Sequence, residues 1–208
     1  MWQLILAISL IAPSLAAEAG DLSKQIITAK LAYGSSIDIP RSWQVMRGND
    51  LRAIETTVGA AIDLSGSTKL ADGTESLLVA SFPDPQLYGG VTVTSTAIRG
   101  STRSSVATLS DAQVKSGELA IRQGLEATLA RLGGRTWAWT PLKKVSIAGA
   151  TVLHISYLRS SEAGDRRVHI YKFFATGRVF DLALSTSVAN EDLNRVVLTR
   201  IANSFVAQ

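Results

Sequence analysis

Apolar and polar residues alternate along the chain from Val145 onward, and near the C-terminus this alternation gives way to a helical period. Four stretches of strand length, each bounded by Gly, Ser, Asp or Asn, follow one another at 144–147, 151–159, 167–175 and 179–186. The connections between them are short, whereas parallel strands need long crossover connections. The pattern therefore predicts an antiparallel meander of four strands.

Alternation also predicts which side chains of the meander are buried. Successive side chains of a strand point to opposite faces, so apolar residues two positions apart share one face. One face of the second strand carries Leu153, Ile155 and Tyr157, and one face of the fourth strand carries Phe180, Leu182 and Leu184. We expect both sets to lie in the core.

The C-terminal residues have the period of an amphipathic helix. After Asn190, which can cap a helix, apolar residues recur every four positions at Leu193, Val197, Ile201 and Phe205. The acidic residues that follow Asn190 suit the positive end of the helix dipole. We expect this helix to pack on the meander through its apolar stripe.

Strands and helices also alternate in the middle of the chain. Residues 35–39 read as a strand that Pro40 ends, with 42–46 as its hairpin partner, and residues 77–82 and 91–98 read as two further strands. Between them, Asn49 or Asp50 can cap a helix that Ser65-Gly66 ends. The stripe of this helix consists of Leu51, Ile54, Val58 and Ile62.

A second helix has the clearest start signal in the chain. Ser110 and Gln113 have the spacing of a capping box, in which each side chain satisfies a backbone N–H of the other residue. Gly133-Gly134 ends the helix, and its apolar positions are Val114, Ile121, Leu125, Leu129 and Leu132. Strands joined by hairpins, with helices between them, predict an α+β fold in which helices flank an antiparallel β-sheet.

The first residues resemble a secretory signal peptide. An apolar run covers residues 4–12, and small residues follow at the spacing that a signal peptidase needs. A membrane-spanning helix needs about 20 apolar residues, so this run is too short to be a transmembrane anchor. We expect cleavage after Ala16 or Ala19, with 1–19 as the signal and 20–208 as a single domain. The expected location is periplasmic or secreted.

Several short motifs lie between about Ser35 and Phe205. They consist of Ile37, Ile39, Pro40 and Trp43, the Ile147-Ala148-Gly149-Ala150 segment, residues 171–174, and the Ile201 to Phe205 terminus. Together they resemble the PsbP-like superfamily, in particular its exported, uncharacterised proteobacterial members. This resemblance implies a PsbP-like α/β/α sandwich. Because known members are mostly accessory proteins, it also implies binding without catalysis, and it transfers no site residue to this chain.

Charge and composition limit the kinds of molecule that we expect the chain to bind. The chain has a formal net charge of +4, which favours an anionic envelope component or an acidic protein. Its basic residues are scattered, so we expect no nucleic-acid binding. The chain has no Cys, which excludes disulfides, thiol chemistry and a lipid-anchored Cys.

Few residues suggest catalysis or metal binding. His154 and His169 fall on successive strands of the meander, where they are either two metal ligands or half-buried cross-strand neighbours. A zinc site needs a third ligand, and no Asp or Glu has a suitable spacing on those strands. Asp181 interrupts an apolar strand, where it either has a function, faces solvent or pairs with a neighbouring Arg. We expect no cofactor, no metal and no enzymatic activity.

Two groups of residues are candidates for binding. Trp137 and Trp139 share a face of one predicted strand, where they form either a stacking platform or part of the core. Arg159, Arg166 and Arg167 flank one hairpin loop and Arg178 follows the next, as a basic rim for an anionic partner or as solvated loop residues. The leading functional hypothesis is a noncatalytic exported accessory protein that binds a protein or an envelope component. The alternative is a periplasmic small-ligand carrier, which would have an apolar pocket between sheet and helix.

Overall fold

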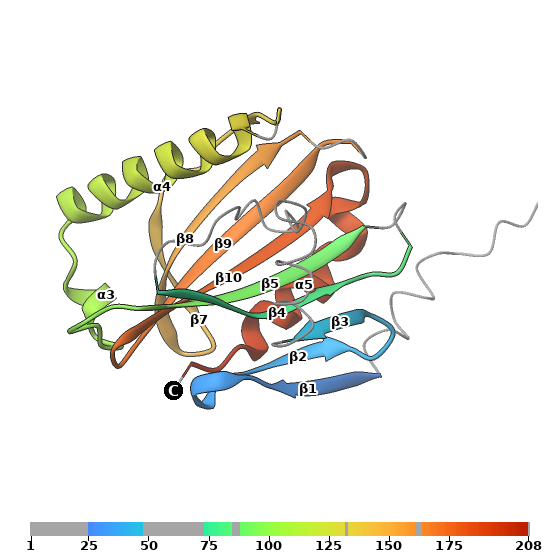
Figure 1. Ribbon diagram of the computed structural model, residues 1–208, viewed down its shortest axis with the longest axis horizontal. Coiled ribbons are helices and arrows are strands. Elements are labelled where there is room, and N and C mark those ends of the chain that lie inside the picture. Colours follow the sequence, from blue (N-terminus) through green and yellow to red (C-terminus); the bar gives the residue numbers. More distant parts are fainter. Residues whose placement is uncertain (1–24, 48–72, 85–87, 132, 161–163, 208) are drawn as a thin grey trace, which may run out of the picture.

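An antiparallel sheet of eight strands forms the centre of the molecule (Figure 1). The computed structural model describes residues 25–47, 73–84, 88–131, 133–160 and 164–207. Seven strands lie in the order β3-β4-β5-β10-β9-β8-β6, and β7 also pairs with β8. Their bounds are β3 Gln44–Arg47, β4 Thr74–Ser81, β5 Gly89–Ala97, β6 Thr136–Trp137, β7 Lys143–Ile147, β8 Ala150–Arg159, β9 Arg166–Ala175 and β10 Arg178–Ser187.

Helices cover both faces of this sheet, as in an α/β/α sandwich. Helix α4 (Asp111–Arg131) packs over Leu153, Ile155 and Tyr157, whereas α5 (Glu191–Ser204) packs over the opposite face. Figure 1 shows α4 in yellow and α5 in red on the two sides. The two buried clusters therefore share the sheet, as the α+β prediction requires.

The predicted meander is confirmed. β7, β8, β9 and β10 pair in sequence order, and each pairing is antiparallel. The turn between β7 and β8 has positive φ at Ala148 (50°) and Gly149 (77°), which is the conformation of a type I′ hairpin turn. Both predicted core sets are buried, but they lie on opposite faces of the sheet.

Both signals that bound the long helix are also confirmed. The Ser110 N–H donates to Gln113 Oε1 (2.8 Å), and the Gln113 N–H donates to Ser110 Oγ (3.2 Å). At the other end, Gly133 has a φ of 73°, and the Gly134 N–H donates to the carbonyl of Leu129 (2.9 Å). This backbone arrangement is a Schellman motif, which satisfies carbonyls at the end of α4. A short helix, α3 (Ser105–Thr108), precedes α4 and had no sequence signal.

Helix α5 is present, but its buried face is rotated from the predicted stripe. Asn190 occupies the N-cap position, and Ile201 is 1% exposed. Leu193, by contrast, is 41% exposed, so its assignment to the stripe was wrong. The neighbouring Asn194 faces the sheet instead, where its Nδ2 donates to Thr186 Oγ1 (2.9 Å) and to the carbonyl of Tyr88 (3.1 Å). A specific polar contact therefore takes the place of an apolar one at the first turn.

The pairing predicted for residues 35–46 was wrong. β2 (Ser36–Pro40) pairs with β1 (Ile26–Lys30), a strand that the sequence analysis did not identify, and together they form a separate two-stranded sheet. β3 pairs with β4 in the main sheet. The Trp43 N–H donates to the carbonyl of Pro40 (3.0 Å), which turns the chain away from β2 after Pro40. The predicted signal peptide, the helix of residues 51–62 and Leu132 lie outside the described residues.

Substituting Ile201 with Asp tests the packing of α5. This change places an unpaired carboxylate among Leu182, Phe205 and their neighbours, so we expect unfolding to become easier by roughly 3–5 kcal/mol. Val196→Asp on the same helix is the control, because Val196 is 68% exposed and the new charge stays in water. Thermal and denaturant unfolding measure both variants, and equal stabilities would contradict the proposed docking of α5.

Candidate functional site

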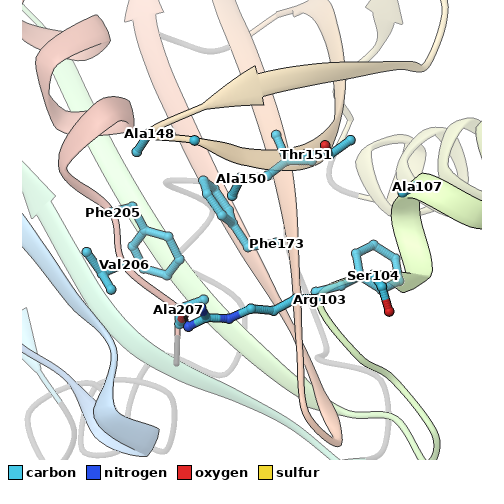
Figure 2. A pocket seen from close by; sticks show the side chains of 13 residues that line it. Arg103, Ser104, Ala107, Ala148, Ala150, Thr151, Phe173, Phe205, Val206 and Ala207 are labelled. Carbon is cyan, nitrogen blue, oxygen red and sulfur yellow. Dashed lines mark hydrogen bonds between the residues drawn. The ribbon is translucent and has the colours of Figure 1, made fainter.

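A cleft of about 470 Å³ lies where the β7–β8 hairpin turn, helix α3 and the segment after α5 meet (Figure 2). These three segments are far apart in the sequence. The cleft is lined by Arg103, Ser104, Ala107, Ala148, Gly149, Ala150, Thr151, Val152, Phe173, Phe174, Phe205, Val206 and Ala207. Most of these side chains are apolar or small.

Two aromatic rings form the firm wall of the cleft. Phe173 of β9 and Phe205 meet edge to face, with ring centroids 4.7 Å apart, and Phe205 also contacts Phe180 (5.9 Å). All three rings are buried in the core cluster on the α5 face of the sheet. Edge-to-face pairs add to the stabilisation from burial, so this wall is held in place by the core itself.

Backbone pairing fixes the chain on either side of Phe205. The Val206 N–H donates to the carbonyl of Ser36 (2.9 Å), and the Ser36 N–H donates to the carbonyl of Val206 (3.0 Å). Lys144 fixes the other side, because its Nζ donates to the carbonyls of Ala107 (3.0 Å) and Leu109 (2.6 Å) and so holds α3 against β7. Tertiary contacts therefore fix the position of each wall of the cleft.

Arg103 is the charged side chain among the described residues that line the cleft. It comes from the segment just before α3 and is exposed. Its Nη2 donates to the carbonyl of Ala207, and Figure 2 shows the side chain reaching from the α3 side toward that residue. A guanidinium has five N–H groups in a fixed plane, and this contact uses one of them. The cleft thus combines apolar walls with a cation at its edge.

The two histidines lie on the same face of the sheet, on the strands that lead to the cleft. His154 Nε2 and His169 Nδ1 are 3.1 Å apart and share a hydrogen bond, and Tyr171 stacks on His154 with centroids 4.5 Å apart. Burial lowers the pKa of His154 to about 4, and the charge that His169 carries when protonated and the charge of Lys143 contribute to this shift. Burial also lowers the pKa of His169, although the Glu191 carboxylate opposes that shift. Both imidazoles are therefore neutral at pH 7, as a half-buried cross-strand pair.

Three of the four arginines of the predicted basic rim lie at one end of the β8–β9 hairpin, where Arg159 is opposite Arg166 in the register, but they do not form a rim. Arg159 is 2% exposed and so cannot belong to a solvated rim. Arg166 lies over the Tyr88 ring (3.7 Å to its centroid), and Arg167 pairs with Glu191 (3.7 Å). Arg178 lies at the other end of the ten-residue strands, roughly 30 Å away at 3.3 Å per residue. The prediction that Arg178 joins the others was wrong, because Arg178 lies at the turn of the β9–β10 hairpin, whereas Arg166 and Arg167 lie at its open end.

The prediction that Trp137 and Trp139 share one face of a strand was also wrong. β6 ends at Trp137, and Ala138 between the two tryptophans has a φ of 50°, which breaks the alternation of a strand. Trp139 stacks on Tyr157 (4.5 Å between centroids) beneath α4, with the Arg122 guanidinium also near its ring. The Arg135 guanidinium lies 5.2 Å from the centroid of the Trp137 ring. The two rings therefore have different partners.

Asp181 pairs with Lys172, which lies directly opposite it on β9. Lys172 Nζ lies 2.7 Å and 2.8 Å from the two carboxylate oxygens. Within the described ranges, no group of three or more His, Asp or Glu side chains could hold a metal ion. No helix in the described part of the chain is long and apolar enough to cross a membrane.

Sequence reasoning missed the cleft. It identified Phe205 as a residue of the helix stripe, which agrees with the structure in part, because Phe205 is buried but follows the end of α5. Nothing in the sequence links this position to Arg103, which lies about 100 residues before Phe205. An isolated Arg in a stretch rich in Ser and Thr gives no signal of its own.

Replacing His154 or His169 with Gln tests the state of the imidazole pair. Because the folded chain holds the pKa of both groups below the ordinary 6.5, the unfolded chain takes up protons first as the pH falls. The native protein should therefore lose stability from pH 6.5 downward, toward pH 4. Each single variant should show a shallower fall in Tm between pH 6.5 and 5, a range that lies above the ordinary pKa values of carboxyl groups. Parallel Tm curves for all three proteins would contradict this interpretation.

The comparisons with known proteins concern the fold. Neither a protein-family model nor a curated protein matches the chain. The solution structure of cyanobacterial PsbP (CyanoP) from Synechocystis is similar, with a TM-score of 0.58 and 12% identity over 88% of this chain and 93% of that one. A putative regulator of unknown function from Pseudomonas aeruginosa has a TM-score of 0.43 and 13% identity, covering 88% of this chain and 98% of that one. The similarity to CyanoP shows that the chain has a PsbP-like α+β fold.

Proposed function

We propose that the protein is a noncatalytic, exported accessory protein that binds a protein or an envelope component, and that the cleft is its binding surface. The observation that carries this proposal is the cleft itself, which joins apolar walls to the Arg103 guanidinium. The PsbP-like fold adds support, because most members of the superfamily that the sequence resembles are accessory proteins. The net charge of +4 favours anionic partners.

The chemistry of the cleft favours binding over turnover. Ser104 supplies a hydroxyl to the lining, but its Oγ lies 3.0 Å from the Thr102 hydroxyl, and the described lining residues include no His, Asp or Glu that could act as its base. The two histidines share a hydrogen bond with each other, and neither of them lines the cleft. A serine nucleophile needs a base within hydrogen-bond reach.

The cleft volume also gives support to the alternative function, a periplasmic carrier of a small ligand. Sites for small molecules have volumes of roughly 300–1,000 Å³ and mostly apolar walls with a few polar groups. The volume of about 470 Å³ falls within that range. The two functions differ in whether the native occupant is a macromolecule or a small molecule.

Site-specific photo-crosslinking in the cells of origin tests the binding surface. A photoreactive benzoylphenylalanine at Thr151, an exposed residue of the cleft, should form an adduct with the native partner. The same residue at Gln123, on the exposed side of α4, is the control and should give no adduct. Mass spectrometry identifies the occupant as a protein or as a small molecule.

Two results would count against the proposed function. Equal adducts at both positions, or none at Thr151, would remove the cleft as the binding surface. Turnover in a panel of esterase and phosphatase substrates that is lost when both histidines are replaced with Gln would overturn the noncatalytic assignment.

Export has its own test. We expect protein recovered from the periplasm or the medium to begin at Ala17 or Gly20, because the apolar run and the small residues after it resemble a signal peptide. Leu6→Arg places a charge in the apolar run and should keep the uncleaved chain inside the cell. N-terminal sequencing of both fractions makes the comparison, and an intact Met1 in the exported fraction would contradict cleavage.

A further inference from the structure

We infer that the cleft binds an anionic, single-chain amphiphile, with the acyl tail against the phenylalanine wall and the anionic head group on Arg103. This inference deepens the proposed function and rests on it. It identifies the envelope component by its chemistry, as a fatty acid or a related lipid with one exposed tail and one anionic group.

The apolar part of the cleft suits an acyl tail. Ala107, Ala148, Gly149 and Ala150 contribute small side chains or none on one side, which leaves room between the hairpin turn and α3. The rings of Phe173 and Phe205 form the opposite wall. Transfer of each CH₂ group from water into such a site is favourable by about 0.8 kcal/mol, so affinity should rise with tail length.

The polar part of the cleft suits an anionic head group. Arg103 lies at the edge of the apolar walls, and an arginine fork binds a carboxylate or phosphate through two parallel N–H bonds. Lys144 adds a second positive charge close by, since its Nζ lies 3.0 Å from the carbonyl of Ala107 in the cleft lining. The described lining residues include no Asp or Glu to repel an anion. The charge at the cleft is therefore complementary to an anionic amphiphile and opposes a cationic one.

Backbone pairing occupies part of the surroundings of the cleft. A peptide that adds a strand needs unpaired N–H and C=O groups along a sheet edge. On the β7 side, the hairpin pairs Ser146 with Thr151 and Ile147 with Ala150, whereas the β8–β9 pairing ends at Leu153 with Lys172. On the other side, Val206 pairs with Ser36. The choice of an amphiphile therefore rests on the apolar lining and the guanidinium, which are the two features that an amphiphile needs.

Calorimetric titration of the purified, detergent-free protein with two probes tests the inference. Dodecanoate and dodecyltrimethylammonium have the same tail length and opposite head-group charges, and both are used below their micelle concentrations. Dodecanoate should bind with a stoichiometry of one and at least about tenfold more tightly than the cationic probe, as expected for one charge-assisted contact. Octanoate should bind more weakly than dodecanoate.

Variants locate the site. Arg103→Gln should weaken dodecanoate binding by about tenfold and leave dodecyltrimethylammonium binding unchanged or slightly stronger. Arg41→Gln is the matched control, because it removes an exposed guanidinium next to the end of β2 that lies away from the Ser36–Val206 bridge. Ala150→Trp should fill the cleft and abolish binding of both probes. Melting temperatures equal to the parent's show that each variant is folded.

The outcomes separate this inference from the proposed function. Equal affinity for the two probes, or equal effects of Arg103→Gln and Arg41→Gln, would overturn the inference. If Arg103→Gln fails to fold, the comparison of the two probes on the native chain still decides. Absence of dodecanoate binding together with a protein adduct at Thr151 would reject the amphiphile and keep the accessory role.

Discussion

The structure depends on how the C-terminal segment is anchored to the sheet, and the contact of Phe205 with Phe173 and Phe180 is the centre of that anchor. Ile201 and Ala202 extend the same buried surface along α5. The anchor also holds the small sheet in place, because Ser204 Oγ accepts a hydrogen bond from the Asp38 N–H (2.9 Å) and Val206 pairs with Ser36. Without this contact, α5, β2 and one wall of the cleft would lose their common support.

The same anchor explains why the cleft lies where it does. Phe205 is the residue after the end of α5, where the chain returns to an extended conformation and runs past the β7–β8 turn. Small residues at that turn do not fill the space, and Arg103 reaches toward it from the α3 side. The cleft is thus a consequence of the fold: a large ring fixes one wall, and side chains opposite it are too short to close the gap.

Strand register determines what the other polar residues do. It places His154 and His169 side by side on one face and Lys172 opposite Asp181 on another pair of strands. It also keeps Arg178 at the far end of the hairpin from Arg166, and puts Arg159 in the interior. Residues with the same charge and similar spacing therefore have different roles, because each position in the register has different neighbours.

Local patterns alone predicted a large part of the fold. The four strands of the meander, the Ser110–Gln113 capping box and the buried position of Ile201 depend on neighbours within a few residues, or on a period that repeats along one element. Such features appear in the sequence because the physical cause lies close by in the chain. The resemblance to the PsbP-like superfamily then supplied the sandwich architecture.

Only the tertiary structure decided which distant residues meet. β2 pairs with β1 and not with β3, and Asn194 replaces Leu193 on the inner face of α5 because Tyr88 and Thr186 offer it hydrogen-bond acceptors. The cleft brings Arg103 to Ala207 across most of the second half of the chain. The sequence by itself determined the meander, α4, α5 and many of the core positions, since hydrophobic period and capping are local properties. The partners of each surface residue and the cleft were decided by packing between elements, which no local pattern records.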